Sequence, residues 1–583
     1  MPEWKNNRMT TKVQIPMRRS RPGASFPTMP FPKDCLTRRA WLSSSAVATL
    51  TALLGSKAGA IGATPIELPA DLQRAAESRR RRIVVQHDAH DVLVRYAKRH
   101  GNEAPFEPFR DAVFAYPDDP LTQIDALWWD VAGSTVGAVY PSQVEPPVDY
   151  PLLQHWLGQG IDWIAELVAG ARKRKLEVFW NHRISEVEGK PEGGLENDRL
   201  HPLKAAHPDW VIPVSFWWQG MWNLAAPGLR EHKLKILREL AANYDLDGIQ
   251  IDFARHVPCL PPGRQWEMRE EVTEFMRMVR GMTLESGARR GRPILLAAKV
   301  PQTLAGCRID GFDVAAWAER GLVDVLTLGS RAMEVETERF REVLGERVQL
   351  QPCFDDHHAT DGYRLAPIEV LRGVFANHWR RGADSVVTFN WATGLPELCK
   401  EIGCEAGSLS QRDAYREVGA VATMKGKDKD FALDRRGGYP WAIGFFNRND
   451  TAALPAAINE TATDFQIHIA DAPTAEASLT IRLVLWGGAE GDQFEVKLNG
   501  APLAEAKRDP EWKDAQIFSP KPQPTSGGSG QYEVNPRQRL LRIDYPASVW
   551  RQGPNALTLR RLPGAANETR LEKLEAHLRY HAS

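Results

Sequence analysis

The sequence predicts an α/β protein, a (β/α)8 TIM barrel followed by a smaller all-β jelly-roll sandwich. Eight short apolar runs alternate with helix-period segments between about residue 80 and residue 395. Beyond about residue 430 the runs alternate apolar and polar residues and are separated by Gly, Pro and Asn. The first pattern is typical of a closed parallel barrel and the second of a β-sandwich. We therefore expect a leader at 1–63, a barrel at 75–430 and a sandwich at 431–583.

The predicted barrel strands are apolar along their whole length, as strands covered on both faces should be. They are Ile83–His87, Ala126–Asp130, Leu176–Asn181, Gly248–Asp252, Ile294–Val300, Val323–Leu328, Val348–Phe354 and Ser385–Asn390. Active sites of such barrels lie at the carboxyl ends of the strands, so the residues just past each run are the first candidates for function.

Segments with helical periodicity lie between these strands. They include Gln154–Lys173, Leu229–Tyr244, Trp266–Glu285, Val335–Leu344 and Ile368–Arg381. A transition follows the barrel, with a helix predicted at Ser410–Val418 and a Lys/Asp-rich turn at Lys425–Asp430.

Seven strands with period-two alternation predict the C-terminal sandwich. They are Tyr439–Phe446, Asp464–Ile469, Ser478–Trp486, Phe494–Leu498, Arg539–Tyr545, Ala556–Arg561 and Leu571–Tyr580. Asn499-Gly500 is a strong signal for a tight hairpin turn. The Pro/Gly/Ser-rich segment Pro520–Gly530 predicts a flexible loop inside this domain.

The leader resembles a twin-arginine export signal. Arg38 and Arg39 precede a short apolar run, Ala46–Leu54, and Ala58-Gly59-Ala60 then fits a small-x-small cleavage site. The apolar run is too short for a permanent membrane span, which needs about 20 residues. We expect a protein exported to the periplasm or beyond, with no stable membrane span once the signal is removed.

The composition favours a soluble protein with an uncharged partner. Hydrophobic residues make up 43% and charged residues 25%, and the 74 basic residues balance the 74 acidic ones. This balance gives no electrostatic reason to expect nucleic acid. The 19 tryptophans favour carbohydrate, because indole faces stack on sugar rings, although core packing accounts for many of them.

The cysteines give no sign of a metal cluster or a disulfide framework. Five follow the leader, an odd number that rules out complete intramolecular pairing. Cys399 and Cys404 are close enough for a small loop disulfide, which export would allow but not require. No cofactor is expected.

The densest motif series runs from His207 to His256. It contains His207-Pro208-Asp209-Trp210, then Trp222–Pro227, a helical stretch, and the strand text Asn243-Tyr244-Asp245-Leu246-Asp247-Gly248-Ile249-Gln250-Ile251-Asp252. In this order the segments resemble a family of bacterial glycosyl-hydrolase-like barrel proteins, and the resemblance covers about Leu176 to Arg255. It implies a glycoside hydrolase that acts on O-glycosidic bonds of a poly- or oligosaccharide. It does not identify the substrate.

Three C-terminal segments carry a second resemblance. Phe494–Gly500, Val549–Leu557 and Leu574–Leu578 resemble jelly-roll modules of the galactose-binding-like type. Such modules bind glycans or brace the barrel, and the residues do not decide between the two roles.

Asp252 is the first catalytic candidate. It closes the fourth predicted strand, so its carboxylate is expected at the barrel mouth, where glycoside cleavage needs a group to stabilise or attack an oxocarbenium-like centre. Arg255 could keep that carboxylate ionised or bind a hydroxyl. A structural ion pair between the two is the alternative. Asp247 is expected to cap the turn into the strand.

The second carboxylate that hydrolysis requires is less obvious. The seventh strand is followed by Asp355 and Asp356, either of which could be the general acid, tuned by a neighbouring histidine. Glu186 and Asp88 are further candidates after strands three and one. The fifth strand carries Lys299 where many barrel hydrolases have a glutamate, so the identity of the acid and the choice between retention and inversion stay open.

Other residues at the predicted strand ends could bind a sugar by stacking or hydrogen bonding. They are Trp128, Trp129, Trp180, Asn181, His182, Lys299, Asn390 and Trp391. Two alternatives to a hydrolase with carboxylate catalysis remain. One is a non-catalytic glycan-binding barrel that lacks the acid. The other is a metal-dependent hydrolase using His87, Asp88, His90 and Asp91 with the Asp355–His358 segment, although no metal site is assigned.

Overall fold

The computed structural model describes residues 65–78, 80–130, 137–148, 150–184, 201–214, 217–253, 257–330, 332–355, 363, 366–389, 391, 410–435, 452–513, 539–564 and 568–581. All of them lie in one compact unit, residues 64–583. The predicted leader, the strand expected at Tyr439–Phe446, the loop Pro520–Gly530 and the pair Cys399 and Cys404 lie outside the described residues. Cys259, Cys307 and Cys353 are buried free thiols.

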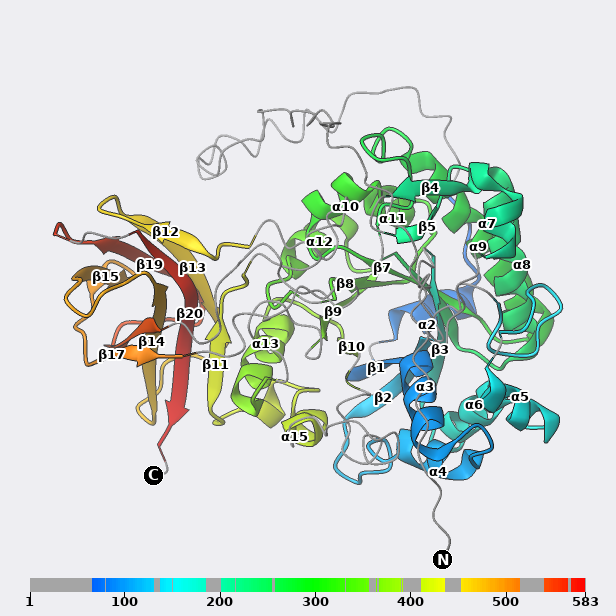
Figure 1. The fold of residues 1–583 in the computed structure, drawn as a ribbon, viewed down its shortest axis with the longest axis horizontal. Coiled ribbons are helices and arrows are strands. Elements are labelled where there is room, and N and C mark those ends of the chain that lie inside the picture. Colours follow the sequence, from blue (N-terminus) through cyan, green and yellow to red (C-terminus); the bar gives the residue numbers. More distant parts are fainter. Residues whose placement is uncertain are drawn as a thin grey trace, which may run out of the picture. The chain divides into compact units, whose positions relative to one another are not determined.

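Eight parallel strands close into a barrel in the order β1-β10-β9-β8-β7-β6-β3-β2, with helices around them (Figure 1). They are β1 (Ile83–Asp88), β2 (Ile124–Asp130), β3 (Glu177–Arg183), β6 (Gly248–Asp252), β7 (Leu295–Val300), β8 (Val325–Leu328), β9 (Gln349–Asp355) and β10 (Val386–Phe389). The predicted fold class and all eight predicted strands are confirmed.

The strands are apolar throughout because each one faces two hydrophobic layers. Side chains such as Val84, Ala297 and Val387 form a small core inside the barrel. Their neighbours, such as Val85, Ala298 and Val386, belong to the larger core under the helices. This alternation decides which side chains can reach the barrel interior.

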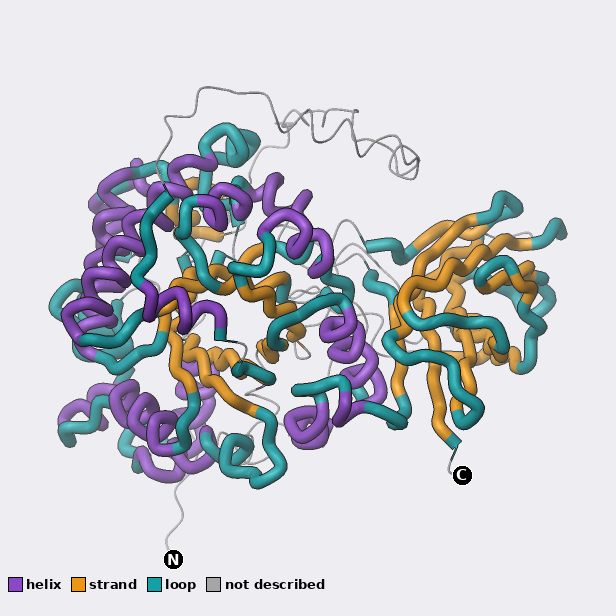
Figure 2. Tube along the Cα trace, turned by 180° about the vertical axis from the view of Figure 1, so that it is seen from behind, coloured by secondary structure: helices purple, strands orange, loops and turns teal. Residues whose placement is uncertain are grey.

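Helices surround the barrel strands (Figure 2). They are α2 (Ala70–Glu77), α3 (Ala89–His100), α4 (Phe106–Val113), α5 (Pro151–Gly158), α6 (Trp163–Lys173), α7 (Pro202–Ala206), α8 (Pro227–Asn243), α9 (Arg269–Arg290), α10 (Leu304–Asp310), α11 (Val314–Glu319), α12 (Thr337–Leu344), α13 (Ile368–Arg380) and α15 (Ser410–Glu417). Helix α2 precedes β1, α15 follows β10, and the others lie between strands in the sequence.

One predicted helix is wrong as a single element. Gln154–Lys173 is divided between α5 and α6, because Gly160 adopts a φ of 80° and Asp162 caps the second helix by accepting hydrogen bonds from the backbone of Ile164 and Ala165. The hairpin of β4 (Val211–Val214) and β5 (Trp217–Trp222), between β3 and α8, was also not predicted.

Two antiparallel sheets form the C-terminal sandwich. The six-stranded sheet contains β11 (Lys429–Ala432), β20 (Thr569–Tyr580), β14 (Ala477–Trp486), β18 (Leu540–Ala547) and β17 (Lys507–Trp512), with β12 (Ala456–Ile458) beside β20. The four-stranded sheet contains β13 (Thr463–Ile469), β19 (Gly553–Arg561), β15 (Phe494–Leu498) and β16 (Ala501–Pro502).

Two turns near the sandwich strands test the sequence predictions. Asn499 and Gly500, with φ of 51° and 83°, join β15 to β16 as the hairpin signal predicts. The predicted turn at Lys425–Asp430 is wrong at its end, because Lys429 and Asp430 already belong to β11 and pair with β20.

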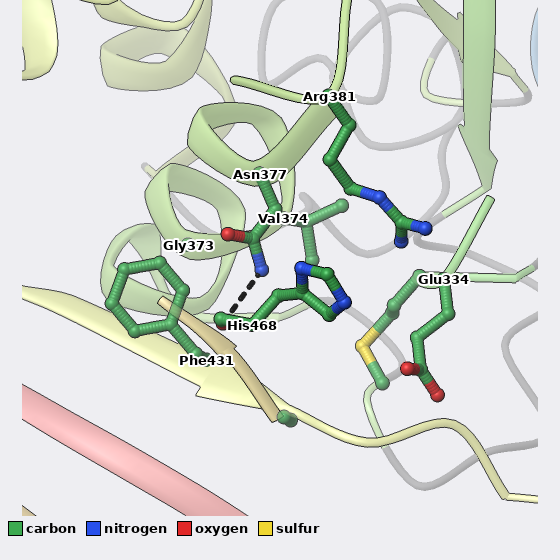
Figure 3. Close-up of a pocket in the computed structure, with 9 residues that line it drawn as sticks. Glu334, Gly373, Val374, Asn377, Arg381, Phe431 and His468 are labelled. Carbon is green, nitrogen blue, oxygen red and sulfur yellow. Dashed lines mark hydrogen bonds between the residues drawn. The ribbon is translucent and has the colours of Figure 1, made fainter. Parts of the chain in front are cut away.

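Helix α13 of the barrel packs closely against the first sandwich strand. A Cβ added to Gly373 would lie 2.0 Å from the Asp430 carbonyl oxygen, and Asn377 donates a hydrogen bond of 3.0 Å to the His468 carbonyl (Figure 3). The space left between these elements for the centre of a water molecule is about 10 Å³, enough for one water but not for a sugar. At this place the barrel and the sandwich pack directly against each other, and whether the sandwich also binds glycan stays open.

Candidate active site at the mouth of the barrel

Asp252 is the last residue of β6, and its carboxylate points into the barrel. Its Oδ2 accepts hydrogen bonds from Asn181 Nδ2 at 3.1 Å and from Gln86 Nε2 at 3.3 Å. Gln86 belongs to β1, which two strands separate from β6 in the barrel order, so the two side chains can meet only in the interior. Asp252 is therefore not turned into the helix layer.

Lys299 lies beside Asp252, in register on the neighbouring strand β7. Its Nζ donates to Gln86 Oε1 at 3.3 Å and lies 3.5 Å from the centre of the Phe389 ring. The side chain is fully buried. Lys299 is thus buried near the end of the fifth barrel strand, where many barrel hydrolases have a glutamate.

Asp355 ends β9 and is also fully buried. It lies two residues beyond Cys353, which belongs to the core inside the barrel, so Asp355 faces the same interior as Asp252 and Lys299. The pKa of Cys353 is raised to about 12, mainly by burial and also by the charges of Asp355 and Asp252, while the positive charge of Lys299 opposes the rise. The barrel interior therefore brings two carboxylates and one ammonium group together.

A layer of uncharged polar side chains links three strands in the interior. Gln250 Nε2 and Gln351 Nε2 both donate to Thr327 Oγ1, at 2.6 and 2.7 Å, and Ser385 Oγ donates to Gln351 Oε1 at 2.9 Å. These bonds satisfy polar groups that would otherwise be costly to bury. They hold three of the strands in a fixed relation.

The tryptophans expected to stack on sugar are core residues in the structure. Trp129 and Trp180 belong to the core under the helices, and so does Trp391, which packs against Phe375 and Tyr415. Trp128 lies inside the barrel, fully buried, with its ring parallel to Phe179 at 4.2 Å. All four rings are buried in the structure, and contact of any of them with a sugar stays a prediction.

The remaining predicted residues divide into two groups. Asn181 reaches Asp252, whereas the next residue, His182, has the strand parity of Trp180 and faces the helix layer. Arg255, Asp356, Asn390 and the alternative acid Glu186 lie outside the described residues, as does the side chain of Asp88. Their assigned roles stay predictions.

Gln86 and Phe389 are interior residues that the sequence analysis missed. Both lie at inward positions two residues beyond Val84 and Val387, which line the interior. Counting every second residue from these valines would have placed Gln86 and Phe389 on the inward face of their strands, where Lys299 and Asp252 also lie. Cys353 could have been found in the same way.

Two open cavities lie away from the carboxylates. One, of about 430 Å³, lies at the amino-terminal ends of β1, β2, β3 and β6 and is lined by charged residues including Arg81, Glu177 and Asp247. Most of these charges are paired, as in Arg81–Glu177 and Arg172–Asp247. Asp247 also accepts from the Val178 backbone at 2.8 Å, in keeping with the structural role expected of it. The other cavity, of about 320 Å³, is lined partly by α2.

Two searches of the described residues give negative results. No group of three or more His, Cys, Asp or Glu side chains within that part of the chain is arranged to hold a metal ion. Among the helices in the same ranges, none combines the length and the apolar character that a membrane span needs.

Comparison with known families finds a match for the part of the barrel that contains β2, β3 and β6. Residues 118–262 match the model of the family described as glycosyl hydrolase-like 10. We refer to residues 118–262, which match this family model, as the glycosyl-hydrolase-like segment. The resemblance inferred from the His207–Asp252 motifs is thereby confirmed, and the glycosyl-hydrolase-like segment contains both Asn181 and Asp252. Lys299 and Asp355 lie beyond it. A comparison with curated proteins found no match.

Solved structures similar to this chain include carbohydrate-active enzymes at low identity. An α-amylase of Geobacillus thermoleovorans is 11% identical over 83% of this chain and 98% of its own, with a TM-score of 0.36. A cycloisomaltooligosaccharide glucanotransferase of a Paenibacillus species is 9% identical over 87% and 58%, with a TM-score of 0.32. An α-L-fucosidase of Paenibacillus thiaminolyticus is 12% identical over 59% and 49%, with a TM-score of 0.35. The chain thus spans about half of the last two proteins, and identities this low say nothing of its chemistry.

Proposed function

We propose that the protein is a glycoside hydrolase that cleaves O-glycosidic bonds of a poly- or oligosaccharide, with Asp252 as a catalytic carboxylate. The observation that supports this most is the place of Asp252 at the carboxyl end of β6, directed into the barrel within the glycosyl-hydrolase-like segment. Barrel enzymes carry out their chemistry at this end of the strands.

Two hydrogen bonds hold the Asp252 carboxylate in the barrel interior. Asn181 and Gln86 both donate to the same oxygen, which fixes the direction of the group. We assign Asp252 the role of nucleophile or base. Asp355 and Asp356 are the proposed candidates for the general acid, of which Asp355 faces the same barrel interior as Asp252.

We also propose that the protein acts after export, in the periplasm or outside the cell. The support is the Arg38-Arg39 pair ahead of a short apolar run and a small-x-small site. Fusing residues 1–63 to a reporter protein and measuring its export, with Arg38 and Arg39 changed to lysine as the control, tests this part separately.

The test of the hydrolase is a digest of a glycan library with the wild type and with Asp252→Asn. We expect products from the wild type and a loss of at least about 10³-fold for the variant, because a group bound to the reacting centre is removed. Asp245→Asn is the matched control, since Asp245 is an exposed carboxylate just before the same strand. Equal product from wild type and Asp252→Asn would remove Asp252 from the mechanism.

A second candidate function is glycan binding without catalysis. Burial favours it, because Asp252 is only 2% exposed and Asp355 is 0% exposed, and a catalytic carboxylate must reach its substrate. The cation Lys299 in place of a glutamate points the same way. Glycan binding by the wild type with no product from any library member would support this candidate over the hydrolase.

A further inference from the structure

Three side chains from three strands form a hydrogen-bond chain inside the barrel. Lys299 on β7 donates to Gln86 on β1, and Gln86 donates in turn to Asp252 on β6. The two bonds are both 3.3 Å long. We call this the Lys299–Gln86–Asp252 chain.

The chemistry of the two ends fixes the direction of both bonds. An ammonium group can only donate, so the oxygen of the Gln86 amide must face Lys299. An ionised carboxylate can only accept, so the NH₂ of the same amide must face Asp252. Gln86 therefore has one orientation that satisfies both partners, although the two ends of an amide look alike in shape.

The surroundings of the chain leave Gln86 little freedom. Gln86 and Lys299 are fully buried, and Phe389 lies against the ammonium group. Asn181, which lies on β3, donates a hydrogen bond to the same Asp252 oxygen. Bonds in such a low-dielectric interior are strong and costly to lose. One Asp252 oxygen is thus held by two amides, and one of these amides is itself oriented by a buried cation.

We propose that Gln86 is a positioning residue for Asp252: held by Lys299 on one side, its amide orients the Asp252 carboxylate on the other. This inference rests on the proposed hydrolase function for its kinetic consequence. In this arrangement Lys299 acts on Asp252 through Gln86. It does not take over the general-acid role of the glutamate that many barrel hydrolases have at this position.

The sharpest variant is Gln86→Glu. Glutamate has the shape of glutamine and still accepts from Lys299, so a merely structural role for Gln86 would tolerate it. It has no NH₂ to donate to Asp252, however, and adds a like charge beside it. We expect kcat to fall by about 10- to 100-fold with KM changed less than about threefold, since misplacing a reacting group by a fraction of an ångström has effects of this size. The fall in kcat caused by Gln86→Leu should lie within the same range.

Gln351→Leu is the matched control. Gln351 is an equally buried interior glutamine with its own hydrogen bonds, but these go to Thr327 and Ser385 and not to Asp252. This variant should lose thermal stability while the kcat of its folded fraction stays near the wild-type value. If Asp252→Asn is inactive and Gln86→Glu keeps the wild-type kcat, the inference is wrong while the hydrolase function stands.

A second readout does not depend on any activity. If Gln86 connects Lys299 to Asp252, the losses in Tm caused by Gln86→Leu and Lys299→Met will not add, and the double variant will lose less than their sum. Additive losses would overturn the chain even for a protein that cleaves no glycan. A wild type without activity but with non-additive losses would instead overturn the proposed function and leave the hydrogen-bond chain in place.

Discussion

Gly248 and Phe179 pack so closely inside the barrel that no side chain fits between them. A Cβ added to Gly248 would lie 2.3 Å from Phe179 Cε2. Phe179 cannot move aside easily, because its ring is stacked on Trp128 at 4.2 Å and the Arg81 guanidinium lies 5.8 Å from its centre. Gly248 begins the strand that ends at Asp252, so this contact sets how closely β6 lies to β3.

The first prediction is that Gly248→Ala destabilises the barrel. Forcing an extra methyl group into a packed core costs about 1–3 kcal/mol, and here the neighbour is an aromatic ring held from two sides. Thermal or denaturant unfolding of the variant measures this cost. We also expect lower activity, because a shift of β6 moves Asp252.

Gly281→Ala is the control for that substitution. Gly281 lies in the middle of α9 with no atom near the position of the added Cβ, and alanine is the better helix former. It should raise stability by up to about 1 kcal/mol. A Gly248→Ala variant as stable as the wild type would show that the Phe179 ring can move aside to make space for the added methyl group.

The barrel strands could be predicted because burial on both faces leaves a plain sequence signal. Runs such as Ile294–Val300 contain few polar residues and are too short for helices, so both their existence and their limits follow from composition. Short helices such as α10 and α11 have no comparable signal. Their few turns are stabilised by packing on the barrel and not by a long amphipathic pattern.

The sequence predicts which residues lie near the strand ends but not which face of the strand they occupy. Asp252 and Lys299, both chosen for their places near strand ends, lie side by side in register in the interior. Trp180, chosen in the same way, faces the helix layer. Gln86 was missed because its partners are distant in sequence, and only the closed barrel brings them together.

The second prediction concerns the other amide at Asp252. Asn181→Asp keeps the shape of the side chain but replaces the donor Nδ2, 3.1 Å from Asp252 Oδ2, with a second carboxylate oxygen. Two carboxylates at this distance cannot both ionise without a large penalty. We expect kcat/KM to fall by about 10²-fold or more, and by more than in Asn181→Ala, which removes the donor without adding a charge.

The comparison of the two Asn181 variants decides the cause of the loss. If Asn181→Ala is the more damaged of the two, packing and not the charge of Asp252 explains the result. Measuring both across pH separates the alternatives further. Protonation of the added carboxyl at low pH should recover part of the activity of Asn181→Asp, whereas Asn181→Ala has no such group to titrate.

The third prediction concerns His577, which lies between two carboxylates of the sandwich sheet. Its Nδ1 is 2.8 Å from Asp430 Oδ1 and its Nε2 is 2.9 Å from Glu575 Oε2. Both ring nitrogens can donate only when the imidazole is protonated. Although burial opposes the charge, the bonds to Asp430 and Glu575 raise the pKa of His577 above its ordinary value. Burial likewise opposes ionisation of Glu575, but His577, Lys573 and Tyr363 lower the pKa of its carboxyl to about 2.

The pKa values of His577 and Glu575 shift in opposite directions. The cluster of His577, Asp430 and Glu575 therefore stabilises the fold most within a limited pH range. The contribution of His577 to stability is complete below its unfolded pKa, about 6.5, and is lost as the pH rises through the higher folded value. The contribution of Glu575 is complete above its unfolded pKa, about 4.3, and is lost as the pH falls towards 2. The cluster therefore stabilises the sandwich most between about pH 4.5 and 6.5.

The measurement is the Tm of the wild type and of His577→Gln across this range. Glutamine keeps one donor group but cannot carry the charge, so the Tm difference should be largest near pH 5.5 and should shrink towards pH 9, as the wild-type imidazole loses its proton. His155→Gln on α5 is the control, because it makes the same change of side chain outside the sandwich, and the pH dependence of the His577 variant is compared with it. A Tm difference between wild type and His577→Gln that stays constant or widens up to pH 9 would mean that the imidazole is neutral in the folded protein. Packing of the ring, and not its charge, would then explain its contribution to the contact between β11 and β20.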